Sequence, residues 1–90
     1  MIKHYNITVS GKVQGVFFRA SAKKKAEEIG LSGFVKNKNN DQVYIEIEGE
    51  ETLVNKFIDW CYIGPANSQV EKIEKTESPL KNFFDFDIIR

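Results

Sequence analysis

Apolar and polar residues alternate along several short stretches of this chain, and a period of two is typical of a strand with one buried face. From Val43 to Glu48, for example, every second side chain is apolar. The alternation breaks at Val70 and Ile73, which predicts a bulge in the fourth strand. The segments predicted as strands are residues 4–10, 33–37, 43–48, about 68–77 and 84–88.

Two longer stretches repeat their apolar residues at spacings of three and four, which is typical of the buried stripe of an amphipathic helix. The first helix is predicted over about residues 16–29, after which Gly30 favours a left-handed stop. The second is predicted from about Glu50, whose charge suits a helix start, to Gly64 and Pro65. The residues predicted to form the two stripes are Phe18, Ala22, Ala26, Ile29, Leu53, Phe57, Trp60 and Cys61.

The predicted order is strand, helix, strand, strand, helix, strand, followed by a short terminal strand. This order favours an α+β fold of the ferredoxin-like, split β-α-β type, a sandwich in which two helices cover one face of an antiparallel sheet. Residues 1–90 contain no repeat or Pro/Gly-rich linker, so we expect a single domain. The opposite sheet face is expected to be largely solvated and to carry His4, Asn6, Thr8, Lys36, Tyr44, Glu46 and Glu48.

The composition is that of a soluble globular protein, since 41% of the 90 residues are apolar and 29% are charged. Thirteen basic and thirteen acidic residues cancel, which argues against a general nucleic-acid or membrane binder. No apolar run is long enough to span a bilayer. Cys61 has no second cysteine to pair with, so a cytoplasmic location is expected, and one cysteine with one histidine cannot complete a zinc site.

The charges are nevertheless distributed unevenly. Residues 1–40 hold eight basic and two acidic residues, whereas residues 41–90 hold five basic and eleven acidic ones. Within the basic part, residues 10–19 join the first strand to the first helix, and Gly11 and Gly15 let backbone amides curl around a small oxyanion there. This distribution directs attention to the loop before the first helix as a candidate anion site.

The helix after this loop starts poorly unless an anion binds to it. No Ser, Thr, Asp or Asn lies beside Val16 or Phe17 to cap it, and Arg19 in its first turn opposes the helix dipole. A bound anion satisfies both the free amides and the cation. The chain has eleven lysines and two arginines, and a planar guanidinium grips two phosphate oxygens where a lysine does not. The alternative is a plain turn with Arg19 as a solvated surface residue.

Residues 11–19, Gly-Lys-Val-Gln-Gly-Val-Phe-Phe-Arg, resemble the signature loop of the acylphosphatases at every position. Residues 33–37, Gly-Phe-Val-Lys-Asn, are similar to the second motif of that family, which continues to Gly49, and the resemblance covers essentially the whole chain. At one position the chain departs from the family, because Asp41 stands where a glycine is usual. The hairpin is therefore expected to place Asp41 or Asn40 in the left-handed region.

The resemblance implies a hydrolase that cleaves the carboxyl–phosphate bond of an acyl phosphate to a carboxylate and inorganic phosphate. It implies Arg19 and Asn37 as catalytic residues, with Asn37 orienting the attacking water. An amide is too weak a base to deprotonate that water, so its role is positioning. The site has no carboxylate to hold Mg²⁺, and neither a metal nor another cofactor is expected. The residues implied to bind the substrate are Gln14, Gly15, Val16, Phe17, Phe18 and Arg19.

Other chemically reactive residues have plainer explanations. His4 is expected on the solvated sheet face rather than in catalysis, and Cys61 is expected to be a small buried residue. Glu46 and Glu48 are expected to point outward, in positions where they would repel phosphate. The run of lysines at 23–25 is predicted to be a solvated helix face that helps to draw anionic substrates inward.

The alternative from another functional class is a ferredoxin-like module that binds an anion or RNA without turnover. A net charge of zero argues against RNA binding, and the first strand and residues 33–37 lack the paired stacking aromatics that RNA-binding modules use. A simple phosphate pocket also has no need of Asn37 to orient water. The expected partner is therefore a small-molecule acyl phosphate, with no nucleic acid and no membrane. A monomer is expected, and the last strand is the edge through which copies would otherwise associate.

Overall fold

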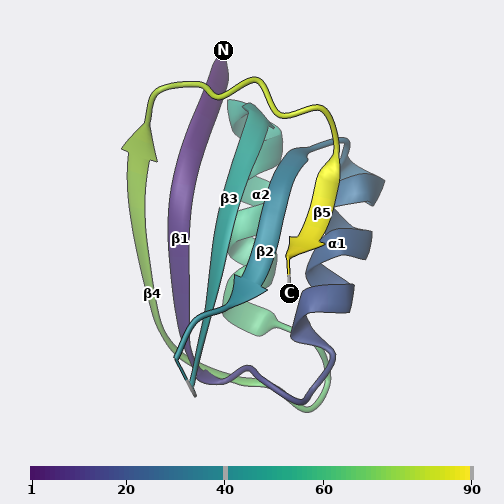
Figure 1. The fold of residues 1–90 in the computed structure, drawn as a ribbon, viewed down its shortest axis with the longest axis vertical. Coiled ribbons are helices and arrows are strands. Elements are labelled where there is room, and N and C mark those ends of the chain that lie inside the picture. The colour runs from purple at the N-terminus through teal and green to yellow at the C-terminus, as the bar shows by residue number, and fades with distance from the viewer. Residues whose placement is uncertain (40, 90) are drawn as a thin grey trace.

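The computed structural model describes residues 1–39 and 41–89, and these contain the predicted strands and helices in the predicted order (Figure 1). None of the helices in the described ranges has the length and apolarity needed to cross a bilayer. The elements are β1 (Ile2–Lys12), α1 (Phe18–Ile29), β2 (Ser32–Asn37), β3 (Gln42–Glu50), α2 (Glu51–Ile63), β4 (Gln69–Ser78) and β5 (Phe86–Ile89).

The strands form one sheet in the order β4-β1-β3-β2-β5. The predicted fold class is confirmed, but the sheet is mixed rather than antiparallel, because β5 pairs in parallel with β2. Residues 79–85, here called the crossing segment, carry the chain from β4 at one edge of the sheet to β5 at the other (Figure 1). Since the chain crosses at the end of the sheet where β2 begins, β5 then runs in the same direction as β2.

One core lies between the helices and the sheet, and it is built from the predicted stripes and alternating strands. In α2 the buried stripe also includes Val54 and Ile58, whereas Leu53 and Trp60 are only partly buried beside it. A fully buried large apolar side chain contributes about 1.5–3 kcal/mol, so this layer holds both helices against the sheet. The residues of the sheet that complete the core are Ile7, Val9, Val35, Val43, Ile45, Ile47 and Phe86.

The end of β1 is shaped by a glycine and by the predicted bulge. Glu71 is the extra residue of the bulge, because Ser10 pairs with Lys72 and the next residue, Gly11, pairs with Val70. Gly11 has a φ of 131°, and a Cβ at this position would collide with the backbone oxygen of Gln69 in β4. The close approach of the two strands therefore requires glycine, and it directs the chain out of the sheet into the loop before α1.

One end of the sheet face away from the helices is covered, contrary to the prediction that this face is largely solvated. His4 is fully buried, and Glu46 and Glu48 are only 6% and 5% exposed. Backbone amides of the crossing segment donate to Glu48, so this segment lies against the acidic side chains. Phe84, predicted within the last strand, lies in the crossing segment with 98% of its surface exposed. Alternation within a strand cannot predict a cover that comes from a distant part of the chain.

The three buried polar residues form a network with half-buried Tyr44 and exposed Lys81, here called the His4 cluster (His4, Tyr44, Glu46, Glu48 and Lys81). His4 is hydrogen-bonded through Nδ1 to Glu48 Oε1 and through Nε2 to Glu46 Oε1, each at 2.9 Å. Glu46 also accepts hydrogen bonds from the Tyr44 hydroxyl and the Lys81 ammonium, both at 2.7 Å. Glu48 accepts two backbone amides of the crossing segment, at 2.7 and 3.1 Å. The cluster thus fastens the crossing segment to β1 and β3.

The hydrogen bonds of the His4 cluster keep both carboxylates charged. Burial by itself would raise the pKa of Glu46 and Glu48, but the donors around them outweigh burial and hold the pKa of each below its usual value. Desolvation and the hydrogen bond to Glu46 raise the pKa of Tyr44 to about 12, so its hydroxyl stays a donor. The cluster is a charged network whose donors and acceptors are matched to one another.

Candidate active site

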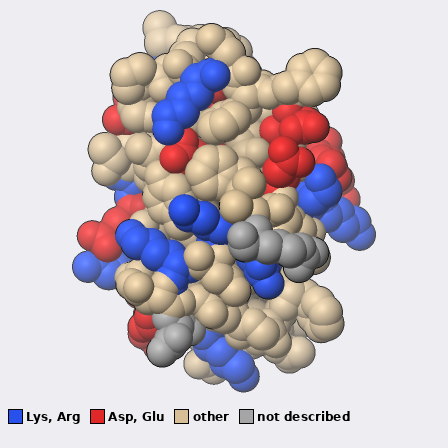
Figure 2. All heavy atoms as spheres, viewed as in Figure 1, with Lys and Arg blue, Asp and Glu red and all other residues tan. Residues whose placement is uncertain are grey.

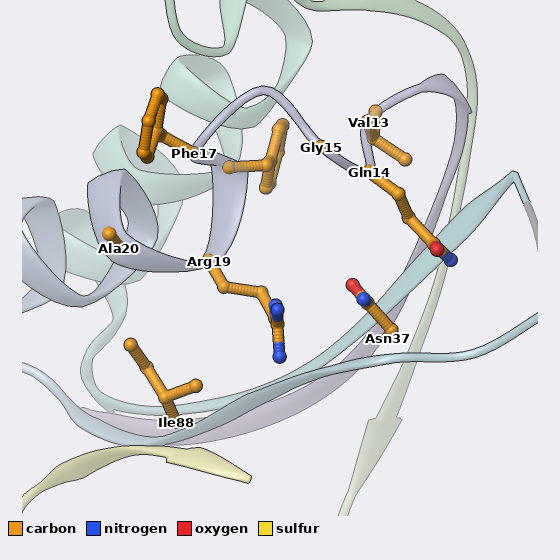
Figure 3. A pocket seen from close by; sticks show the side chains of 9 residues that line it. Val13, Gln14, Gly15, Phe17, Arg19, Ala20, Asn37 and Ile88 are labelled. Atoms are coloured by element: carbon orange, nitrogen blue, oxygen red, sulfur yellow. The ribbon is translucent and has the colours of Figure 1, made fainter. Parts of the chain in front are cut away.

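A cavity of about 420 Å³ opens between the start of α1 and the end of β2 (Figure 3). It brings together the two motifs singled out in the sequence, which lie far apart along the chain. Val16, also predicted as a site residue, does not line the cavity, because its side chain packs in the core. The predicted site residues that line the cavity are Gln14, Gly15, Phe17, Phe18, Arg19 and Asn37.

The loop that enters α1, here called the amide loop (residues 14–20), has an unusual backbone. Gly15 has a φ of 72°, and Phe17, the N-cap of α1, lies in the left-handed region with a φ of 63°. As predicted, no side chain caps the helix and no acidic residue lies in its first turn. The amides of residues 14–20 donate no hydrogen bond to any other residue in the described ranges. A run of such N–H groups at the positive end of a helix dipole is suited to binding an anion.

Arg19 lies in the first turn of α1, where its charge opposes the helix dipole. Its guanidinium extends into the cavity toward the end of β2 that carries Asn37 (Figure 3). It forms no salt bridge with a carboxylate in residues 1–39 or 41–89. A cation held at the positive end of a helix without a carboxylate beside it is suited to an anionic ligand.

Asn37 is the last residue of β2 and pairs with Val43 of β3. Side chains alternate across a strand, so Asn37 lies on the helix side of the sheet, whereas Lys36 and Lys38 lie on the other side. The Nζ atoms of these lysines are 5.7 and 5.8 Å from the ring centroid of Tyr44. Figure 3 shows the amide of Asn37 directed into the cavity beside Arg19. The end of β2 thus supplies one neutral polar group to the site.

Gln14 connects the amide loop to the hairpin between β2 and β3. Its side-chain amide donates to the backbone oxygen of Gln42 at 2.8 Å and to that of Asn39. The side chain therefore holds the loop in position relative to Asn37, and a bond from Gln14 to a ligand would come from its backbone amide. Near this hairpin, Asp41 accepts a hydrogen bond from the Gly11 amide at 3.0 Å, and the expectation for Asn40 lies outside the described residues.

The surroundings of the cavity favour an anion. No aspartate or glutamate lines it among the residues that the structure describes. Figure 2 shows the molecule from the side seen in Figure 1, with lysine and arginine side chains numerous across the middle of the view and most acidic side chains in its upper half or at its margins. This view is of the sheet face opposite the helices, where charges of both signs lie. At the cavity itself, the described lining holds Arg19 and no carboxylate, which is what favours an anion there.

His4 is not part of this cavity. It lies on the other face of the sheet, and both of its ring nitrogens are bonded to carboxylates. The prediction that His4 is exposed was wrong, although it correctly kept the residue out of the proposed site. Cys61 is a buried thiol in α2, and burial raises its pKa.

Three residues that line the cavity were not among the predicted site residues, namely Val13, Ala20 and Ile88. Val13 lies within the first motif and Ala20 directly follows it, so their place in the sequence was a usable signal. Ile88 had no such signal, because it reaches the site only through the parallel pairing of β5 with β2, in which Ile88 lies beside Val35.

Comparison with known proteins agrees with this geometry. The family model "Acylphosphatase" matches residues 5–88. An acylphosphatase of Roseiflexus sp. (strain RS-1) is 42% identical over 85 residues, which cover 93% of this chain and 91% of that protein. The structure of an acylphosphatase from Coxiella burnetii has a TM-score of 0.94 at 38% identity and covers 98% of this chain and 93% of its own. That of Bacillus subtilis has a TM-score of 0.94 at 36% identity, with both chains fully covered. The chain described here belongs to the acylphosphatase family.

Proposed function

We propose that the cavity hydrolyses acyl phosphates, with Arg19 and the amide loop binding the phosphoryl group and Asn37 orienting the attacking water. Membership of the acylphosphatase family supports the reaction class. The observation that carries the residue roles is that Arg19 and a run of backbone amides, none with a partner in the described chain, face one cavity with Asn37. Such a set of donors neutralises charge on the equatorial oxygens of a phosphoryl group in transfer.

The reaction needs few groups from the protein. The water oxygen forms a bond to phosphorus while the bond from phosphorus to the acyl oxygen breaks, and that electron pair leaves with the carboxylate. One water proton moves to a phosphoryl oxygen and the other stays on the new hydroxyl, so the products are a carboxylate and dihydrogen phosphate. A carboxylate is a good leaving group and the transition state is loose, so no strong protein base is required. Asn37 contributes by holding the water in line.

The proposal includes the finer expectations from the sequence. The reaction proceeds without a metal, which is supported by the absence of a carboxylate among the described residues that line the cavity. The protein acts as a monomer in the cytoplasm, with residues 1–90 as one domain, and the single buried Cys61 suits a reducing compartment. Activity with chelator present tests the first of these points, and gel filtration tests whether the protein is a monomer.

The direct test is release of phosphate from acetyl phosphate with chelator present. Replacing Arg19 by alanine removes the guanidinium from the phosphoryl oxygens, and we expect kcat/KM to fall by about 10³-fold. Arg19→Lys keeps the charge but not the two-pronged grip, so most activity is lost in that variant as well. Wild-type protein that releases no phosphate would overturn the proposed function.

Asn37→Ala tests the positioning of water, and we expect a loss of about 10²-fold, mainly in kcat, with phosphate still a competitive inhibitor. Asn55→Ala is the matched control, since Asn55 is an exposed asparagine of α2 that does not line the cavity. Full activity in Asn37→Ala would exclude the proposed role. A non-catalytic anion-binding module, the alternative considered above, would bind phosphate in all these variants except those of Arg19 and release none.

A further inference from the structure

A second hollow, here called the sheet groove, lies on the face of the sheet without helices, the face seen in Figures 1 and 2. Its volume of about 390 Å³ is within the range of about 300–1,000 Å³ typical of small-molecule sites. None of its residues lines the cavity at the start of α1, because Asn37 points to the opposite face of the sheet. The residues that line the sheet groove are Phe34, Lys36, Lys38, Tyr44 and Glu46.

Two aromatic rings give the sheet groove an apolar surface, and contacts outside the groove hold them in place. The ring centroids of Phe34 and Tyr44 are 5.9 Å apart. Phe34 also packs edge-on against Phe83 of the crossing segment, with centroids 5.8 Å apart, and the Tyr44 hydroxyl donates to Glu46 at 2.7 Å. Both rings are half-buried, so part of each remains accessible. A fixed and accessible aromatic surface is suited to stacking against a planar ring of a ligand.

The two lysines of the sheet groove supply positive charge beside these rings. The Nζ atoms of Lys36 and Lys38 are 5.7 and 5.8 Å from the ring centroid of Tyr44. Neither lysine forms a salt bridge with a carboxylate in residues 1–39 or 41–89. Both side chains are exposed, where a cation–π contact is weak. Each ammonium group can therefore turn from the ring to an anion at little cost.

Glu46 is the one carboxylate among the described residues that line the sheet groove, and it opposes an anion only weakly. It is 6% exposed, and its carboxylate is hydrogen-bonded to His4, Tyr44 and Lys81. The ammonium group of Lys81, at 2.7 Å, compensates its charge. The charge that remains at the groove is that of its two lysines.

The geometry points to a site for a nucleoside monophosphate, whose base stacks on Tyr44 and Phe34 and whose phosphate lies between the ammonium groups of Lys36 and Lys38. A phosphate monoester carries a charge of about −1.5 to −2 at neutral pH, which two lysines match. An aryl carboxylate shares the ring but carries a single charge, so it complements the groove less well. This site is separate from the cavity and does not depend on the proposed hydrolysis.

The test is calorimetric titration of adenosine monophosphate (AMP) into the full chain carrying Arg19→Ala, which weakens binding of phosphate in the cavity. AMP is expected to bind this protein at one site and to shift the amide NMR signals of β2 and β3. Adenosine lacks the phosphate, and inorganic phosphate lacks the ring. We expect each to bind at least about tenfold more weakly than AMP, and benzoate likewise.

Variants made in the same background separate the two parts of the site. Lys36→Ala and Lys38→Ala are each expected to weaken AMP binding about three- to fivefold, because one exposed ion pair is lost. Tyr44→Leu removes the stacking ring, and a loss of about tenfold is expected. Tyr44→Phe keeps the ring and loses the bond to Glu46, so it should retain binding. Lys56→Ala is the matched control, since Lys56 is an exposed lysine of α2 that does not line the groove, and its affinity should be unchanged.

The outcomes that would overturn the inference are distinct from one another. Unchanged affinity for AMP in the double variant Lys36→Ala/Lys38→Ala would remove the lysines from the site. Inorganic phosphate binding as tightly as AMP would remove the ring, and benzoate binding as tightly would remove the nucleotide. Binding to the wild type that disappears in Arg19→Ala would place AMP in the cavity. Because each readout is binding, a protein that hydrolyses no acyl phosphate still tests the groove, and circular dichroism checks that every variant is folded.

Discussion

The two polar regions of this molecule lie on opposite sides of the same sheet and are built on contrary principles. In the His4 cluster, charged groups are buried, and the ring nitrogens and both carboxylates have partners within the protein. In the cavity, Arg19 and the amides of the amide loop have no partner in the described chain. The first region stabilises the fold, whereas the second leaves its donors to a ligand.

The backbone shows the same contrast. Among the described residues that are not glycine, Phe17 and Asn82 have positive φ values, 63° and 57°. Asn82 lies in the crossing segment, and asparagine tolerates this conformation because its side chain bonds locally. Phe17 lies at the cavity and has no such compensation. The left-handed position in the crossing segment is therefore filled by a residue that tolerates it, whereas the one at the cavity is filled by a residue that does not.

The largest expected effect comes from breaking the His4 cluster. Glu48→Ala leaves His4 without one of its carboxylates and two backbone amides of the crossing segment without an acceptor, in a site that is almost fully buried. We expect the free energy of unfolding to fall by about 3–5 kcal/mol, measured by urea denaturation. Arg19→Ala, which removes an equally charged residue from the cavity, is expected to leave stability unchanged or slightly higher.

A loss of stability in Arg19→Ala as large as that in Glu48→Ala would abolish the distinction between the two regions. It would mean that Arg19 has a structural partner. Activity completes the comparison, because Glu48→Ala is expected to turn over substrate at a temperature where it remains folded, and Arg19→Ala is not.

Phosphate is expected to add stability through the cavity and not through the His4 cluster. Phosphate that binds the folded cavity and not the unfolded chain is expected to stabilise the protein by about 2.7 kcal/mol at a concentration about 100 times its dissociation constant. The measurement is the urea midpoint in phosphate against chloride of equal ionic strength. Glu48→Gln should keep this increment, since it leaves the cavity intact, whereas Arg19→Ala should lose it. An equal increment in both variants would assign the effect to the salt rather than to the site.

Lowering the pH is expected to reduce the stability that the His4 cluster contributes, by less than either effect above. The pKa values of Glu46 and Glu48 are lowered in the folded protein, so their stabilisation is complete above the ordinary carboxylate pKa of 4.5. It is lost as the pH falls through the folded values, because the unfolded chain takes up protons first. We expect the pair to account for about 1–2 kcal/mol of the stability lost between about pH 6 and pH 3. Urea denaturation over this range, with Glu48→Gln as reference, measures it, and parallel curves for both proteins would contradict the assignment.

How far each region could be predicted depends on where its residues lie in the sequence. The cavity was predictable because the amide loop and Arg19 are contiguous and Asn37 ends the next strand. The His4 cluster was not, since alternation in β1 and β3 places His4 and Glu48 on the sheet face without helices and cannot reveal what covers that face. The place of Ile88 in the cavity was unpredictable for the same reason, because it depends on where the crossing segment brings β5 to pair with β2.

The smallest expected effect is the change in stability when the residue with the strained backbone at the cavity, Phe17, is replaced by glycine. Its sign is expected to differ from that of the same replacement in the crossing segment. Glycine adopts a φ of 63° without the penalty of about 1–2 kcal/mol that a Cβ brings, but it loses about 0.5–1 kcal/mol more conformational entropy on folding. Phe17→Gly is therefore expected to stabilise the protein by up to about 1 kcal/mol, even though it removes the ring at the mouth of the cavity.

Phe84→Gly is the matched reference for this effect, because Phe84 is likewise exposed but does not have a positive φ. At Phe84 no backbone strain is relieved, so only the larger loss of conformational entropy of glycine counts, and stability is expected to fall by about 0.5–1 kcal/mol. Urea denaturation of the two variants gives opposite signs if Phe17 is held in a conformation that folding alone disfavours. Equal losses would mean that the loop relaxes in solution, and the ring of Phe17 would then no longer be a preorganised part of the site.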